Sequence, residues 1–206
     1  MFTNAIILEM IKTILFDYAG VITPTRSQIP WVKENTERFK MTVDELFDCI
    51  REHWSDAKVN KITSEEYWKK LGERLKENPT VLKNELIASF PVDVKVIELS
   101  RKLHSNYTTV LVSNQIEDWL EEVIKTYNLN EIFDYNISSY NTGFSKPDKR
   151  IFEEILKRTK SSYEECLLID DQTKNTNVAA ELGIRTILYT SYENFIDGLD
   201  KLDVNM

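Results

Sequence analysis

The chain has 206 residues, a length that suits one domain or one domain with an insertion. Hydrophobic residues make up 42% of the chain, enough for a sizeable core, and the formal net charge is −8. This charge disfavours nucleic acid and an anionic membrane surface as partners, because both require concentrated Lys and Arg. It leaves room for a small anion held at a local positive spot.

The cysteines and the first residues bear on the compartment. Cys49 and Cys166 lie in apolar runs and are predicted to be free, buried thiols. The first twelve residues contain no basic leader and no cleavage site, and no apolar run approaches the roughly 18 residues of a membrane span. We therefore expect a cytoplasmic protein, with translation starting at Met1 or at Met10.

A buried strand is predicted at residues 12–16, where apolar residues lead directly into Asp17. A loop follows at 17–27. Residues 28–90 then differ in character, because they are charged, aromatic and patterned as helices, with no convincing strand. This stretch is inserted at the edge of the sheet where Asp17 lies, so we expect it to form a lid.

Helix starts are visible inside this insertion. Thr42, followed three residues later by Glu45, has the pattern of a capping box. Thr63 opens another helix, and Pro79 separates it from a further one. Pro91 closes the insertion.

Strands and helices alternate from residue 93 onward. Strands are predicted at 108–112, 135–138, 166–169 and 184–189, and helices at 93–104, 116–127, 148–159, 175–182 and beyond 189. Such alternation implies a parallel sheet covered on both faces. We predict an α/β fold, a Rossmann-like doubly wound parallel sheet formed by residues 1–22 and 91–206, with an inserted α-helical cap subdomain at 23–90.

Polar residues follow three of the predicted strands. They are Asp17 after the first, Ser113 and Asn114 after the second, and Asp170 and Asp171 after a later one, with Lys146 in a loop before a helix. In a parallel sheet these loops open on the same edge. Each residue alone is more typical of a turn or a helix cap, but their joint placement favours one shared site.

The residue types indicate a chemistry. Carboxylates gathered from distant loops repel one another unless a cation joins them, and the oxygens of Asp17 and Asp171 suit Mg²⁺. A carboxylate can also act as a nucleophile and form an aspartyl-phosphate. A Ser hydroxyl, a Lys and backbone amides around it would hold phosphoryl oxygens and offset their charge.

Four segments carry a resemblance to a known family. The chain resembles the haloacid dehalogenase (HAD) superfamily of aspartate-nucleophile hydrolases, in the subfamily with a helical cap after the first strand. The segments are ILFDYAGVIT, VLVSN, SKPDKRIFEEIL and LLIDDQTKNTNVAAELGIRTI. The first is similar to the FDxGGVI-like group, which lacks the second aspartate of that motif.

The resemblance implies a set of metal ligands. Asp17 would be both the nucleophile and a ligand of Mg²⁺. The backbone carbonyl of Ala19 and the carboxylate of Asp171 would complete the protein's share of the metal shell, with Asp170 and Asn175 supporting them.

The resemblance also implies a phosphate site and a function. Ser113 and the amide of Asn114 would bind phosphoryl oxygens, and Lys146 would screen Asp17 and touch the transferred group. The implied protein is a Mg²⁺-dependent phosphatase, a phosphoric monoester hydrolase. It would act on a small phosphorylated metabolite such as a sugar phosphate, through an aspartyl-phosphate, as a monomer or homodimer.

One position departs from the pattern. Phosphatases of this superfamily usually carry a second aspartate two residues after the nucleophile, and here that residue is Ala19, which cannot transfer a proton. General acid–base help of this kind is worth about 10²–10⁴-fold in rate. Weak activity, a substitute group or water, and a good leaving group are the three explanations left open. His53 is more typical of a structural residue than of such a substitute.

Three alternatives therefore remain. The first is a catalytically weak or inactive HAD-fold binding or regulatory protein. The second is a metal-free hydrolase of the haloacid type. The third is a phosphonate hydrolase, which needs a lysine in the cap, and Lys40 and Lys58 are its positional candidates. Arg26 and Arg51 are more typical of a solvated surface than of anion contacts.

Overall fold

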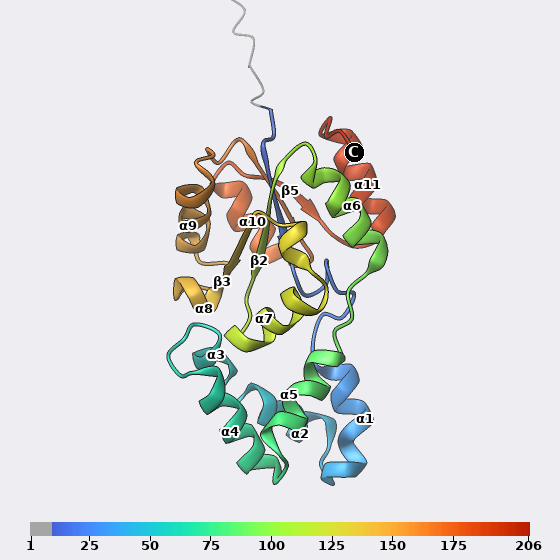
Figure 1. Ribbon diagram of the computed structural model, residues 1–206, viewed down its shortest axis with the longest axis vertical. Helices are drawn as coiled ribbons and strands as arrows, with labels where there is room; N and C mark the ends of the chain where they lie inside the picture. Colours follow the sequence, from blue (N-terminus) through green and yellow to red (C-terminus); the bar gives the residue numbers. More distant parts are fainter. Residues whose placement is uncertain (1–9) are drawn as a thin grey trace, which may run out of the picture.

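The computed structural model describes residues 10–206, so the prediction that concerns Met1 lies outside the described residues. Five parallel strands form one sheet in the order β3-β2-β1-β4-β5 (Figure 1). The strands are β1 (Thr13–Asp17), β2 (Thr108–Ser113), β3 (Tyr135–Ser138), β4 (Cys166–Asp170) and β5 (Arg185–Leu188). The central strand β1 therefore has β2 and β4 as its neighbours, and all three carboxyl ends meet at one edge.

The strand β1 is buried on both faces, which explains its continuous apolar run. Ile14 and Phe16 belong to one hydrophobic cluster and Leu15 to another, because successive side chains of a strand point to opposite faces. The first cluster includes side chains of α6 (Val94–His104), α7 (Glu117–Thr126) and α11 (Tyr192–Lys201), and the second those of α9 (Lys149–Thr159) and α10 (Thr173–Glu181). The predicted doubly wound α/β fold is confirmed.

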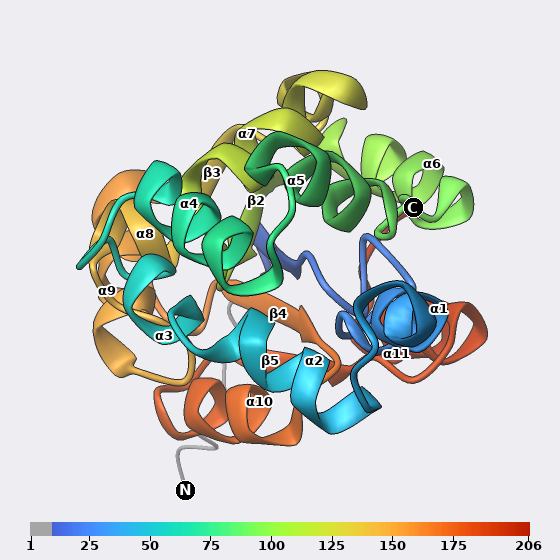
Figure 2. The same ribbon diagram turned by 90° about the horizontal axis from the view of Figure 1, so that it is seen from below.

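Five helices lie between β1 and α6 in the sequence. They are α1 (Ile29–Phe39), α2 (Val43–Arg51), α3 (Trp54–Ala57), α4 (Ser64–Leu75) and α5 (Pro79–Ala88). Figures 1 and 2 show this helical insertion beyond the edge of the sheet toward which β1 runs. The backbone N–H of Glu45 donates to the Thr42 hydroxyl oxygen, and the backbone N–H of Thr42 donates to the Glu45 carboxylate, so the predicted capping box forms.

Some short elements were not predicted. The helices α3 and α8 (Ser139–Thr142) and the 3₁₀ turn η1 (Leu129–Glu131) are single turns. One turn is too short to show the apolar periodicity by which longer helices are found in a sequence.

An aromatic cluster joins the helical insertion to the core. The ring of Trp119, on α7, is buried against three rings from the inserted segment. Its centroid lies 5.9 Å from that of Trp54, 6.1 Å from that of Trp68 and 5.2 Å from that of Phe90. The indole N–H of Trp68 also donates to Asp118 at 2.9 Å. The insertion is thus held on α7 by stacked and edge-on rings rather than by the polypeptide links alone.

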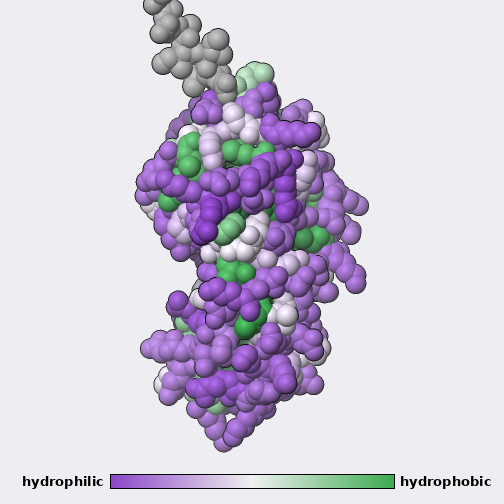
Figure 3. Space-filling model, turned by 90° about the vertical axis from the view of Figure 1, so that its left-hand side faces the viewer, coloured by the Kyte–Doolittle hydropathy of each residue, from purple (hydrophilic) through white to green (hydrophobic). Residues whose placement is uncertain are grey.

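The surface of the molecule is polar, and its two cysteines are buried. Figure 3 shows a largely hydrophilic surface, with a narrow waist between the core and the helical insertion. Cys49 and Cys166 are free and buried, as predicted. Among residues 10–206, every helix is too short or too polar to cross a membrane.

Candidate active site

Asp17 ends β1, and only 4% of the residue is exposed. Its Oδ1 accepts a hydrogen bond from the Tyr18 N–H at 2.7 Å and lies 2.8 Å from Lys146 Nζ. The same ammonium lies 2.7 Å from Asp170 Oδ2 and donates to the carbonyl of Val112 at 2.9 Å. One buried lysine therefore bridges two carboxylates that come from adjacent strands.

Asp170, at the end of β4, is fully buried and surrounded by donors. The Asn175 side-chain amide donates to its Oδ1 at 2.9 Å and to its Oδ2 at 3.0 Å, and the Gln172 N–H donates to Oδ1 at 2.9 Å. Together with Lys146, these donors occupy both oxygens. Such a carboxylate orients its neighbours and has little capacity left for a metal. The supporting role of Asp170 and Asn175 stays a prediction.

Asp171 is placed differently. Its Oδ1 is buried and has no hydrogen-bond partner among residues 10–206, and its Oδ2 lies 3.3 Å from Arg26 Nε. One oxygen from each of Asp17, Asp170 and Asp171 lies within 4.8 Å of the other two. A buried oxygen without a donor is costly unless a cation meets it. This all-oxygen set fits Mg²⁺, with Asp17 and Asp171 as the carboxylates that would hold it.

The turn after β1 presses against Asp171. Gly20 has a φ of +92°, and a Cβ at this position would come within 2.4 Å of both Cγ and Oδ2 of Asp171. A glycine is therefore required by the backbone conformation and by the close approach together. Ala19, just before it, lines the same cavity as Asp17. The predicted carbonyl ligand thus belongs to the turn that touches Asp171.

Burial controls the ionisation of these groups. Burial raises the pKa of Asp17 to about 7, with the charge of Lys146 opposing the shift and that of Asp170 adding to it. Burial and the charge of Asp170 also raise the pKa of Asp171. Burial alone would lower the pKa of Lys146, but Asp17 and Asp170 outweigh it and the pKa is raised. Lys146 is therefore charged, and an added cation would favour the ionised carboxylates.

Ser113 ends β2 and Asn114 follows it, beside Asp17. Ser113 is 2% exposed, and both residues line the cavity that Asp17 lines. The Asn114 side chain donates to the carbonyl of Lys146 at 2.9 Å and accepts from its N–H at 2.8 Å. The Asn114 side chain thus holds the Lys146 loop in place. The group of Asn114 predicted to bind phosphoryl oxygens is its backbone amide, which these two hydrogen bonds do not use.

The cavity has a volume of about 200 Å³ and lies between the sheet edge and the helical insertion. Sequence reasoning did not place six of its lining residues at the site: Gln28, Trp54, Phe90, Gln115, Gln172 and Lys174. Arg26 and Lys58, which it considered only weakly, also line the cavity, whereas His53 and Arg51 do not. Gln115, Gln172 and Lys174 lie in or directly beside the segments that carry the family resemblance, next to predicted site residues. Gln28, Trp54 and Phe90 belong to no such segment, and only the packing of the insertion places them at the cavity.

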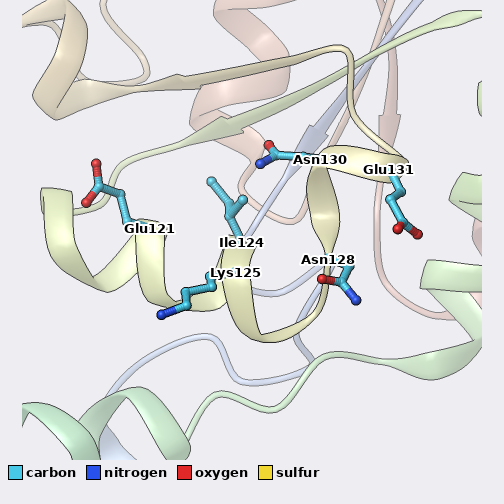
Figure 4. A pocket seen from close by; sticks show the side chains of 6 residues that line it. All are labelled: Glu121, Ile124, Lys125, Asn128, Asn130 and Glu131. Carbon is cyan, nitrogen blue, oxygen red and sulfur yellow. The ribbon is translucent and has the colours of Figure 1, made fainter.

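A second hollow lies elsewhere on the surface. It has a volume of about 470 Å³ and follows α7 and η1 (Figure 4). Glu121, Lys125 and Glu131 are among the residues that line it, and no predicted site residue does. Its charges of both signs are typical of a solvated helix face.

The geometry can be compared with known proteins. A model of the haloacid dehalogenase-like hydrolases matches residues 11–183. The chain therefore belongs to this family. The predicted family, α/β fold and hydrolase class are confirmed.

Individual relatives are more distant. A D-ribitol-5-phosphate phosphatase of Bacteroides thetaiotaomicron is 25% identical over 189 residues, which cover 86% of this chain and 91% of the relative. A predicted HAD-like hydrolase from Porphyromonas gingivalis superposes with a TM-score of 0.78 at 22% identity, over 96% of this chain and 100% of that one. A HAD family enzyme from B. thetaiotaomicron, in complex with magnesium and inorganic phosphate, gives a TM-score of 0.68 at 24% identity, covering 87% and 93%.

The contact between Gly20 and Asp171 can be tested with a matched pair of variants. Gly20→Ala should weaken Mg²⁺ binding by roughly 10–100-fold, because the new Cβ displaces Asp171. Gly143→Ala is the control, since Gly143 also has a positive φ (+75°) but a Cβ added there would meet no atom within 4 Å. Isothermal titration calorimetry with Mg²⁺ measures both, and equal losses in the two variants would contradict the assignment.

The raised pKa of Asp17 predicts how stability depends on pH and metal. Without metal, the folded protein holds this proton up to pH about 7, whereas the unfolded chain releases it near 3.8. The stabilisation is complete below the unfolded pKa, so the free energy of unfolding should fall as pH rises toward 7. Thermal unfolding from pH 4.5 to 8 should show this decline in EDTA and a smaller one in Mg²⁺. Asp17→Asn should flatten the EDTA curve, and an unchanged slope would refute the prediction.

Proposed function

We propose that the protein is a Mg²⁺-dependent phosphatase that hydrolyses a small phosphorylated metabolite, such as a sugar phosphate, through an aspartyl-phosphate on Asp17. One observation carries the proposal. The buried Asp17 carboxylate contacts Lys146 in a cavity shared with Ser113, and it lies beside Asp171, whose Oδ1 has no donor among residues 10–206. The magnesium and phosphate bound by the Bacteroides neighbour support the same reaction class, as does the phosphatase relative.

Each residue then has a task. Asp17 attacks phosphorus, the bond to the leaving oxygen breaks, and a water later attacks the aspartyl-phosphate to release phosphate and restore Asp17. Ser113 and Lys146 hold the phosphoryl oxygens, and Asp171 with the Ala19 carbonyl and Asp17 would hold Mg²⁺. The metal, when bound, neutralises charge that develops on the phosphoryl group.

The leaving group needs a proton that Ala19 cannot supply. Among the described residues that line the cavity, the helical insertion and its flanking loops contribute Arg26, Gln28, Trp54, Lys58 and Phe90, and so no carboxylate or imidazole. The nearest imidazole on the insertion, His53, lies 4.0 Å from the Glu52 carboxylate instead. We infer that water protonates the leaving oxygen. Turnover should therefore depend strongly on leaving-group basicity.

The helical insertion would act as the lid of this site, with the predicted cap boundaries at residues 23–90. Trp54 and Phe90 line the cavity and also pack on Trp119, so they exclude water from the place where the aspartyl-phosphate would form. A cytoplasmic location and a monomeric or homodimeric state remain predictions.

The proposal is tested by two variants and two substrates. Asp17→Asn should reduce turnover of an aryl phosphate by at least about 10³-fold, because the nucleophile is lost. Ala19→Asp should raise turnover of an alkyl phosphate, a poor leaving group, by about 10–100-fold and change the aryl phosphate little. EDTA should abolish both activities. Phosphate release is the measurement, and the function is wrong if neither substrate is hydrolysed with Mg²⁺ present.

A second candidate is a phosphonate hydrolase. Lys58 favours it, because this lysine of the helical insertion lines the same cavity as Asp17, and its pKa is lowered by burial and then by the charges of Lys174 and Arg51. A neutral amine is the form that attacks a carbonyl to give an imine. Lys40 does not line this cavity. Borohydride added with a phosphonoaldehyde would leave Lys58 alkylated if this function holds, and would leave it free in a phosphatase.

A further inference from the structure

The cavity beside Asp17 has an unusual charge balance. Four cationic side chains line it, from Arg26, Lys58, Lys146 and Lys174, against the single carboxylate of Asp17. The whole chain, in contrast, has a net charge of −8. A cavity that concentrates positive charge in an acidic protein points to an anionic ligand.

Two of these cations are already neutralised. Lys146 lies between Asp17 and Asp170, and Arg26 faces Asp171 at 3.3 Å. They belong to the chemistry already described, so they do not account for the excess of positive charge in the cavity.

The excess positive charge comes from Lys58 and Lys174. Among residues 10–206, no carboxylate oxygen lies within 4.0 Å of either ammonium group. The two lysines approach the cavity from different parts of the molecule, since Lys58 follows α3 in the helical insertion and Lys174 lies in the first turn of α10. Like charges brought together from two elements are destabilising unless an anion lies between them.

Lys58 is held in this position by the core. The hydroxyl of Ser139, at the start of α8, donates a hydrogen bond to the backbone carbonyl of Lys58. Lys58 is half-buried, and burial lowers its pKa, with the charges of Lys174 and Arg51 adding to the shift. An anion bound beside Lys58 and Lys174 would offset both the burial of the Lys58 ammonium and the charge of its neighbour.

We propose that the cavity takes a substrate with two anionic groups: the scissile phosphoryl group beside Asp17, and a second anion held between Lys58 and Lys174. The second anion is a carboxylate or a phosphate, so the substrate class is a phosphorylated acid or a bisphosphate rather than the phosphate of a neutral sugar or polyol. This inference rests on the proposed phosphatase function and specifies its substrate. The volume of about 200 Å³ is below the roughly 300–1,000 Å³ of drug-sized ligand sites, so the molecule is small.

Matched ligand pairs test the second anion directly. 3-Phosphoglycerate differs from glycerol 3-phosphate by a carboxylate in place of a hydroxymethyl group, and ribulose 1,5-bisphosphate differs from ribulose 5-phosphate by a phosphate. Titration calorimetry on the Asp17→Asn variant with Mg²⁺ measures binding without turnover. In at least one pair, the doubly anionic ligand should bind about tenfold or more tightly than its partner. The pair with the larger ratio identifies the second anion as carboxylate or phosphate.

Three lysine variants in the same background locate the effect. Lys58→Gln and Lys174→Gln should each remove most of the preference for the doubly anionic ligand. The affinity for the singly phosphorylated ligands should stay within about twofold of its value without the lysine substitution. Lys61→Gln is the control, because Lys61 is an exposed lysine of the same insertion that pairs with Asp56 at 3.5 Å and does not line the cavity. Equal binding within both ligand pairs, or a preference that survives both glutamine variants, would overturn the proposal.

Turnover by the unmodified protein separates this inference from the function on which it rests. Hydrolysis of neutral-ended phosphates at the same kcat/KM as their doubly anionic partners would leave the phosphatase standing and refute the second-anion site. If no phosphate ester is hydrolysed, the proposed function fails. The calorimetric ratio and its loss in Lys58→Gln would then still decide whether the two lysines hold an anion.

Discussion

The buried ammonium of Lys146 is the interaction on which the site depends. It lies within 2.8 Å of a carboxylate oxygen of Asp17 and within 2.7 Å of one of Asp170. All three groups are almost fully buried, so none can rely on water for its charge. Removing one member of a buried ionic network typically costs about 3–5 kcal/mol, because the remaining charge is left uncompensated. The ends of β1 and β4 and the Lys146 loop must therefore be positioned together.

This constraint places Asp170 and Asp171 in different surroundings. Lys146, Asn175 and the Gln172 N–H satisfy both oxygens of Asp170, which becomes part of the scaffold. Asp171, the next residue, keeps a buried Oδ1 that no donor among residues 10–206 reaches. Two adjacent residues of one type thus lie in different surroundings, because donors from other segments occupy both oxygens of Asp170 and leave Oδ1 of Asp171 without a partner among residues 10–206.

The helical insertion contributes aromatic packing and a positive charge to the site. Its aromatic residues pack on Trp119 and fix its position above the sheet edge, while Lys58 reaches the cavity from the turn that follows α3. In the proposed phosphatase, the core would supply the reacting carboxylate and the groups around it, and the insertion would add charge in the same small cavity. The reaction class and the substrate class would then be set by separate parts of the chain.

The sequence by itself determined the sheet, the helices that Thr42 and Thr63 cap, and the aspartate at the end of β1. These features depend on local patterns: continuous apolar runs, side chains that cap the next turn, and short motifs with fixed spacing. It also indicated Lys146 and the paired aspartates through their resemblance to a family. Ala19 was recognisable as a departure because its place in a motif is defined by counting residues from Asp17.

Only the tertiary structure decided which aspartate is satisfied, why Gly20 must be a glycine, and which cations share the cavity with Asp17. Asp170 and Asp171 look equivalent in sequence, and their difference comes from donors on other segments. Lys58 and Lys174 are separated by more than half of the chain, and Lys58 lies in no motif. They line one cavity because the insertion packs on α7 and α8. No local sequence pattern determines which side chains of two packed parts of a chain come to line the same cavity.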